Sequence, residues 1–133
     1  MSNTGVFTLA ALQITAATPK SLLTPILALD RMTAVTLEAS FAYGSGAGTV
    51  IAIVATTFDG GTTWRHIARF DFAVAPLVKT ATITKAPEGV TIYSDLGSEG
   101  VNNGILGNQL AVFLTTTGTY ASNTVLSVRA SVS

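Results

Sequence analysis

The sequence predicts an all-β protein: an antiparallel β-sandwich of about eight strands, in a single domain that spans residues 1–133. Short runs of apolar residues alternate with polar ones at a period of two, which is the spacing of a strand with one buried face. Threonine, valine and isoleucine, which favour strands, are frequent, and no segment shows a long helical period. Both an immunoglobulin-like and a jelly-roll topology fit this pattern.

The first predicted strand is Val6–Ile14. The next segment, Ser21–Met32, is expected to be an extended loop or a short helix, because Pro25 does not fit inside a longer helix. Thr33–Tyr43 alternates most regularly, so one of its faces is expected to be buried and the other wet. The glycines of Gly44–Gly48 then predict a hairpin loop that leads into the following strand.

That strand, Thr49–Phe58, is apolar on both faces. Such a strand lies at the centre of a sheet covered on both sides, or it faces another subunit. One sandwich core covers only one face, so the other is expected to contact a partner. We expect Ile51, Ile53 and Ala55 at the contact, or the opposite face if these residues form the core. The candidate contact strand therefore contains Val50, Ile51, Ala52, Ile53 and Val54.

The segment Thr57–Trp64 is expected to form a hairpin corner, in which an aspartate accepts backbone hydrogen bonds and glycines adopt positive φ. Its sequence, Thr-Phe-Asp-Gly-Gly-Thr-Thr-Trp, resembles the Asp-box, S/T-x-D-x-G-x-T-W, of sialidase-like propellers and many small β domains. The resemblance implies a structural corner away from any active site, with a largely buried tryptophan. Its residues are Thr57, Asp59, Gly61, Thr63 and Trp64.

After this corner, alternation in the strand ending at Phe72 places Trp64, His66 and Phe70 on one face. Arg65, Arg69 and Asp71 lie on the other face. This charged row either pairs across a subunit boundary or is a solvated strand face. The remaining strands are expected at Val78–Thr84, Val90–Ser94, Gln109–Thr116 and Thr124–Val132, with a long loop at Gly97–Gly107.

The composition predicts a subunit of an assembly. Charged residues make up 11% of the chain, against roughly 25% in ordinary soluble domains, and the mean hydropathy is +0.53. A monomer of this composition would carry too little surface charge to stay well dissolved. The net charge of +0 provides no basic field for a nucleic acid, and no apolar run approaches the ~18 residues that span a membrane. Because Met1–Phe7 lacks the basic region of a secretory signal, we expect synthesis in the cytoplasm.

No set of residues predicts catalysis, so we expect no enzyme activity, no catalytic residue and no cofactor. His66 is the only histidine, and the chain has no cysteine to complete a zinc site or a nucleophilic pair. A calcium site formed by Glu88, Asp95 and Glu99 is disfavoured because carboxylates are sparse and the EF-hand spacing is absent. We therefore expect no bound metal.

Residues 33–75 resemble small structural proteins of tailed bacteriophages and prophages, through the segments Val35–Gly46, Ala55–Trp64 and Ile67–Phe72. The resemblance implies a non-catalytic subunit of the virion, made in the host cytoplasm. Its leading interpretation is a capsid decoration, or cement, protein that stabilises the phage head by bridging its neighbours. The implied partners are other copies of the chain and major capsid or neck and tail proteins.

Two alternatives stay open. The chain is a neck or tail protein, or it is a carbohydrate-binding or receptor-binding module. A module of the latter kind needs a groove lined by exposed aromatic residues. The aromatic residues considered for such a groove are Trp64, Tyr43, Tyr93 and Tyr120.

Overall fold

A computed structural model of the chain describes residues 5–30, 32–85 and 89–133. Residues 1–4 and Glu88 therefore lie outside the described part. The described residues form strands and no helix. None of them therefore forms a helix long and apolar enough to cross a membrane. In chain order the strands are β1 (Gly5–Gln13), β2 (Thr18–Leu22), β3 (Ala34–Ala42), β4 (Ser45–Thr56), β5 (Arg65–Phe72), β6 (Leu77–Thr84), β7 (Gly100–Val101), β8 (Leu110–Ala121) and β9 (Val125–Val132).

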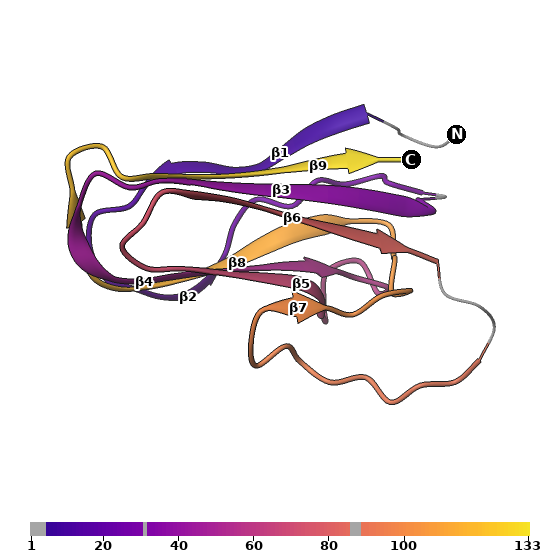
Figure 1. Cartoon of the computed structure of the whole chain (residues 1–133). Helices are drawn as coiled ribbons and strands as arrows, with labels where there is room; N and C mark the ends of the chain where they lie inside the picture. Colours follow the sequence, from indigo (N-terminus) through magenta and orange to yellow (C-terminus); the bar gives the residue numbers. More distant parts are fainter. Residues whose placement is uncertain (1–4, 31, 86–88) are drawn as a thin grey trace.

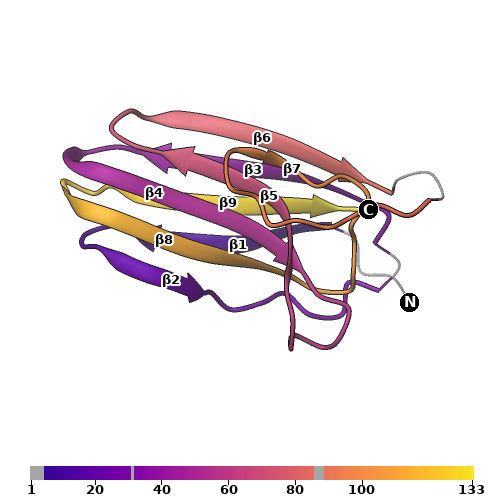
Figure 2. The same cartoon turned by 90° about the horizontal axis from the view of Figure 1, so that it is seen from below.

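The strands form two antiparallel sheets packed face to face (Figure 1). Sheet A has the order β1-β9-β3-β6, and sheet B has the order β2-β8-β4-β5-β7 (Figure 2). The predicted antiparallel β-sandwich is confirmed.

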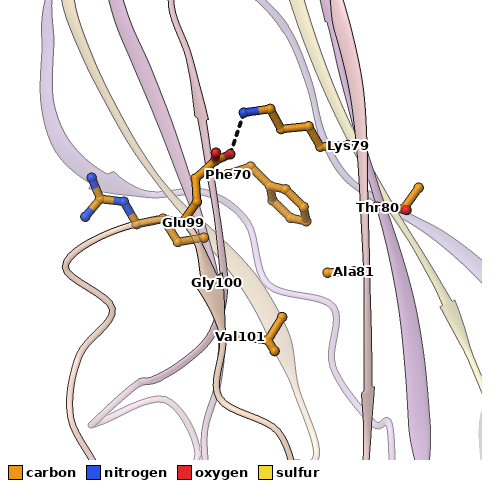
Figure 3. A pocket seen from close by; sticks show the side chains of 8 residues that line it. Phe70, Lys79, Thr80, Ala81, Glu99, Gly100 and Val101 are labelled. Atoms are coloured by element: carbon orange, nitrogen blue, oxygen red, sulfur yellow. Dashed lines mark hydrogen bonds and ion pairs between the residues drawn. The ribbon is translucent and has the colours of Figure 1, made fainter.

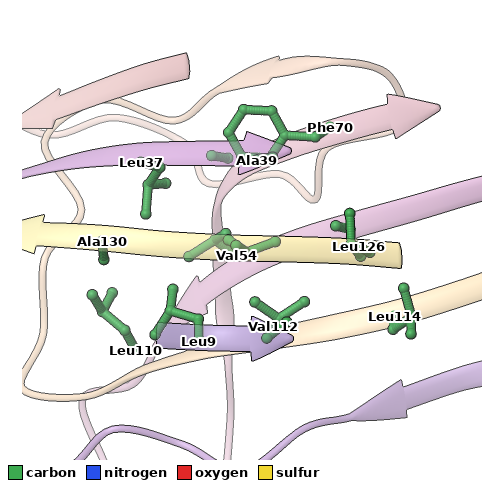
Figure 4. Close-up of a cluster of buried hydrophobic side chains, with 14 of the residues drawn as sticks. Leu9, Leu37, Ala39, Val54, Phe70, Leu110, Val112, Leu114, Leu126 and Ala130 are labelled. Atoms are coloured by element: carbon green, nitrogen blue, oxygen red, sulfur yellow. The ribbon is translucent and has the colours of Figure 1, made fainter. Parts of the chain in front are cut away.

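The core lies between the sheets and is built from alternate residues of each strand (Figure 4). On β4 the inward residues are Val50, Ala52 and Val54, all with 0% exposure. Phe41 of sheet A stacks on Phe72 of sheet B, with 5.2 Å between ring centroids, and so joins the two layers. Burial of each such large apolar side chain stabilises the fold by roughly 1.5–3 kcal/mol.

The predicted hairpin loop Gly44–Gly48 is wrong: Gly44 lies in a crossover between the sheets, because β3 belongs to sheet A and β4 to sheet B, and Gly46 and Gly48 are part of β4. Gly48 lies opposite Gly118 of β8. A Cβ atom on Gly48 would come within 1.9 Å of the Thr117 carbonyl oxygen. Glycine is required here because the two backbones approach too closely for a side chain.

A bulge in β5 changes the direction of His66. Val54 lies opposite Ala68, whereas the next residue, Ala55, lies opposite His66, so Ile67 is an extra residue in the strand. Ile67 and Ala68 both enter the core, and His66 points to the outer face of sheet B together with Ala55. The predicted alignment of His66 with the core residues of β5 is therefore wrong.

The segments predicted least well are those that depend on a partner strand. Val90–Ser94 is not a strand, although its sequence favours one. The predicted loop Gly97–Gly107 contains the short strand β7. The described part of Ser21–Met32 contains no helix: it begins in β2, Ile26 forms an isolated bridge with Leu110, and the Met32 amide donates to the Leu29 carbonyl in a turn.

Candidate functional site

The outer face of sheet B is apolar at its centre. Ile51, Ile53 and Ala55 of β4 point outward, because their neighbours on the strand point into the core. Phe113 of β8 lies opposite Ile53, and Leu22 of β2 lies opposite Phe113. The bulge in β5 adds His66 to this face.

The outer face of sheet A is mostly polar. Glu38 of β3 lies between Arg129 of β9 and Thr80 of β6 in the register of the sheet. Thr36 and Ser131 flank these residues around a shallow hollow of about 340 Å³. The outer face of sheet A thus carries charged and hydroxyl side chains at its centre and the exposed Val6 and Val78 on its edge strands, whereas the centre of sheet B is apolar.

Phe113 is the centre of an aromatic cluster on the outer face of sheet B. The Trp64 ring meets it edge-on at 6.5 Å, and the His66 ring lies 6.4 Å away, both measured between ring centroids. The Lys20 Nζ atom lies over the Phe113 ring, 4.8 Å from its centroid, a cation–π geometry. Trp64 is partly buried here, and it is buried against the outer face of sheet B. Its indole packs on the sheet surface, outside the core.

Sequence reasoning did not identify Phe113 and Lys20. Because side chains alternate along the predicted strand Gln109–Thr116, the sequence places Phe113 on the opposite face from Val112 and Leu114. It does not reveal which face is the core. Lys20 lies in β2, a strand that was not predicted.

The segment Tyr93–Leu96 lies against the outer face of sheet B at β5. The backbone amide of His66 donates to the Tyr93 hydroxyl at 2.6 Å, and this hydroxyl donates to Asp95 Oδ1 at 2.6 Å. The Leu96 amide donates to His66 Nδ1 at 3.1 Å, and Arg69 donates to the Leu96 carbonyl at 3.1 Å. These bonds attach the segment to Arg69, which lies opposite Ile53 in the sheet, and to His66, which lies opposite Ala55.

The same contacts set the protonation states of the cluster. Burial lowers the pKa of His66 below its ordinary value of 6.5, against the attraction of Asp95. The hydrogen bond from Tyr93 lowers the pKa of Asp95, and burial raises the pKa of Tyr93. At neutral pH the imidazole is therefore neutral, as its acceptance of the Leu96 amide requires.

The candidate contact strand is divided between core and surface. Val50, Ala52 and Val54 form the core side. On the outer side Ile53 is 6% exposed, Ala55 is 0% exposed and Ile51 is half-buried. Of the three residues expected at a contact, only Ile51 is partly accessible in one copy, because the side chains of β5 and the segment attached to them lie beside this part of β4.

A hollow of about 500 Å³ adjoins Ile51 and extends the apolar surface toward the turn between β5 and β6. Val74 and Leu77 in this hollow are 52% and 46% exposed. The accessible apolar side chains around this hollow are therefore Ile51, Val74 and Leu77. The residues that line the hollow are Thr49, Ile51, Arg69, Asp71, Phe72, Ala73, Val74, Ala75 and Leu77.

The corner Thr57–Trp64 joins β4 to β5 through a closed set of hydrogen bonds. Asp59 accepts the Thr63 amide at 2.9 Å and the Thr63 hydroxyl at 2.6 Å. Thr57 is buried. Its hydroxyl oxygen accepts a hydrogen bond from the Gly61 amide at 3.0 Å, and the hydroxyl donates to the Thr63 carbonyl oxygen at 2.7 Å. The hydrogen bonds from the hydroxyl and the amide of Thr63 lower the pKa of Asp59 to about 2. This geometry gives the carboxylate a structural role.

The charged side chains of β5 pair within the chain. Arg69 Nε lies 2.8 Å from Asp71 Oδ1, and the Arg65 guanidinium lies 5.0 Å from the centroid of the Tyr93 ring. Glu99 accepts the Asp71 amide at 2.9 Å and also pairs with Lys79. The row of Arg65, Arg69 and Asp71 is therefore occupied by contacts within one copy.

The residues considered for calcium are also engaged elsewhere. Asp95 accepts from Tyr93, and Glu99 pairs with Lys79, while Glu88 lies outside the described residues. In the described part of the chain, no group of three or more His, Asp or Glu side chains comes together to hold a metal ion.

Large apolar side chains are exposed at several places on the molecule. Two of them, Val90 and Ile92, are 100% and 99% exposed. The others are Val6, Leu22, Leu27, Phe58, Val74, Leu77, Val78 and Val101. Single exposed apolar residues are common on proteins, but fully exposed Val and Ile side chains two residues apart are a candidate contact.

Comparison of the chain with known protein families, with curated proteins and with solved structures yields no match. Its function is therefore inferred from the accessible surface and from the composition.

Proposed function

We propose that this protein is a non-catalytic structural subunit of a phage particle, and specifically a capsid decoration protein that stabilises the head. The observation that carries the proposal is the surface: large apolar side chains are exposed on a chain with only 11% charged residues. Permanent interfaces remove such side chains from water and resemble a protein core cut in half. The partners are other copies of the chain and proteins of the capsid.

The difference between the two outer faces supports this assignment. The face of sheet A carries Thr, Ser, Glu38 and Arg129, whereas that of sheet B presents Phe113, Ile51 and the hollow beside it. A decoration subunit needs one side that binds the shell and one that faces water. Binding to the assembled shell alone stabilises that state by mass action.

The test uses particles of a phage or prophage that encodes this chain. Protein mass spectrometry of purified particles should detect the chain, and particles made without the gene should release their DNA at lower temperature. Particles that lack the chain, or whose thermal release is unchanged by its deletion, would contradict the proposal of a stabilising subunit. A copy number proportional to that of the major capsid protein indicates decoration, whereas a few copies per particle indicate the neck or tail.

A carbohydrate-binding module is the second candidate, and the half-buried Trp64 beside Phe113 favours it. An indole at the surface of a sheet can stack on a sugar ring, and Trp64 is the only tryptophan. Its emission therefore reports directly on binding. A saturable change during titration with a panel of bacterial surface oligosaccharides, lost in Phe113→Ala, would support a receptor-binding module. Unchanged emission throughout the panel would count against it.

A further inference from the structure

The segment Val90–Ser94 has the sequence of a strand but no partner strand. Among the described residues, no hydrogen bond reaches the backbone of Val90, Thr91 or Ile92. Their side chains alternate, and those of Val90 and Ile92 are 100% and 99% exposed. Figure 1 shows this part of the chain, between β6 and β7, projecting from the sandwich.

The C-terminal end of the segment is anchored to its own molecule. Tyr93 is bonded to His66 and Asp95, and the Ser94 carbonyl accepts the Asn102 side-chain amide at 3.0 Å. The anchor holds the rest of the segment away from the sheets, with its backbone groups available.

Three of the four edge strands carry features that oppose pairing with another chain. β1 has a bulge between Thr8 and Ala10, which disturbs the edge. β2 is short and contains Pro19 and Lys20. β7 has only two residues. Such features are the usual protection of sheet edges.

β6 is the edge strand with the least of this protection, since its own chain contacts this edge only at Lys79, through Glu99, and at Thr84, through Asn103, among the described hydrogen bonds and ion pairs. It pairs with β3 without a register shift over its whole length, from Leu77 to Thr84, and contains no proline. Its one charged residue, Lys79, is already paired with Glu99. A regular edge strand of this length is a template for an added strand.

The free edge of β6 can be identified from its last residue. The Thr84 amide points away from β3, since it donates to Asn103 Oδ1 at 2.8 Å. Backbone groups alternate sides along a strand, so those of Thr82, Thr80 and Val78 point to the same edge. A hollow of about 370 Å³ adjoins this edge, with Phe70, Ala81 and Val101 among its lining residues (Figure 3). It provides room for apolar side chains of an added strand.

We propose that Val90–Ser94 of one copy adds as a strand to the free edge of β6 in a second copy. This contact satisfies both unpaired backbones at once and removes Val90 and Ile92 from water. Pairing of β6 with β6 across a two-fold axis would leave Val90 and Ile92 exposed. The inference rests on the proposed assembly function and names its partner as a second copy of the chain. A contact between two different surfaces closes into a ring or continues as a chain of subunits.

Cysteine cross-linking tests the contact, because the chain has no cysteine of its own. Purified Ile92→Cys protein is mixed, under mild oxidation, with Lys79→Cys or Ala81→Cys protein, whose side chains lie on the face of β6 that lines the hollow. One of the two mixed proteins is tagged to change its size. The expected result is a mixed disulfide dimer with at least one β6 variant. Val6→Cys, an exposed position on the β1 edge, is the matched control and should give none. No mixed dimer with any β6 variant, or preferential β6-to-β6 dimers, would overturn the proposal.

Sedimentation provides a second measurement. The double variant Val90→Asp/Ile92→Asp should fold with an unchanged melting temperature, because both side chains are exposed, and should lose self-association. Leu27→Asp, a control at a position 61% exposed, should associate as the unaltered chain does. Self-association that survives in the double variant would refute the contact.

These results separate this inference from the proposed function. A chain that cross-links as expected but is absent from particles fails as a virion subunit and keeps the contact. A chain found in particles without the cross-link keeps the function and loses the contact.

Discussion

His66 and Leu96 are joined by a hydrogen bond from the Leu96 amide to the imidazole Nδ1 atom, 3.1 Å long. The bond connects the bulged part of β5 to the segment that carries Val90 and Ile92. Because Nδ1 accepts, this contact requires the neutral form of the imidazole. The position of the segment is thus linked to one titratable group.

Acidification should therefore weaken the fold through His66. Its pKa is lower in the folded chain than the ordinary 6.5, so the unfolded chain binds more protons and stability falls as the pH drops below about 6.5. In His66→Asn, whose side-chain oxygen can accept the same amide, this part of the pH dependence should vanish. Urea denaturation at several pH values between 7.5 and 5 measures both proteins, and equal slopes would contradict the prediction.

The corner between β4 and β5 should depend on the Thr57 hydroxyl. In Thr57→Val the shape is kept, but the Gly61 amide and the Thr63 carbonyl lose the hydroxyl as their partner, at a cost of about 0.5–1.5 kcal/mol for each hydrogen bond. Thr62→Val, at an exposed position of the same corner, should change the free energy of unfolding by less than about 0.5 kcal/mol. Chemical denaturation compares the two variants, and equal losses would exclude a special role for Thr57.

Trp64 should contribute less than a core aromatic residue. Because the indole packs on the outer face of sheet B and its removal leaves no internal cavity, Trp64→Ala is expected to cost roughly 1.5–3 kcal/mol, the transfer free energy of a large apolar side chain. Phe41→Ala, at a position 1% exposed, is expected to cost about 3–5 kcal/mol. Thermal unfolding distinguishes them, and a loss for Trp64 as large as that for Phe41 would place the indole in the core.

Neighbouring residues of β4 should respond differently to a charge. Val50→Lys places an ammonium group in the core, where an unpaired charge is not tolerated, and should prevent folding. Ile51→Lys changes the outer face beside the 500 Å³ hollow and should leave the circular dichroism spectrum intact while weakening assembly. Retained assembly in Ile51→Lys would remove this face from the list of contacts.

Alternation along the chain was sufficient to predict most strands, since each buried face has a period of two. Alternation failed to predict the structure where a single inserted residue, or the presence of a partner strand, determines the conformation. The extra residue Ile67 reverses the direction of His66, and a period-two pattern contains no sign of it. Val90–Ser94 has strand propensity, but a strand also needs a neighbour, which local sequence does not specify. β2 has weak propensity because of Pro19 and Lys20, and its pairing with β8 imposes the extended conformation.

The candidate surface was harder to predict than the fold. Both faces of β4 are apolar, so the sequence did not decide which of Val50 and Ile51 lies inside. Phe113 belongs to the cluster of Trp64 and Lys20 only because β2, β8 and the corner meet on one face. These contacts are between residues far apart in sequence, and neither composition nor spacing encodes them.

The place of β9 in the middle of sheet A constrains how the protein is made. β9 lies between β1 and β3, so the strands synthesised first remain unpaired on these sides until residues 125–132 leave the ribosome. Nearly the whole described chain must then be spanned to pair Gly5 with Val132, which makes closure of the sheet slow. Nascent chains therefore expose open strand edges for most of translation, and stalled or shortened products should be recognised by chaperones or aggregate.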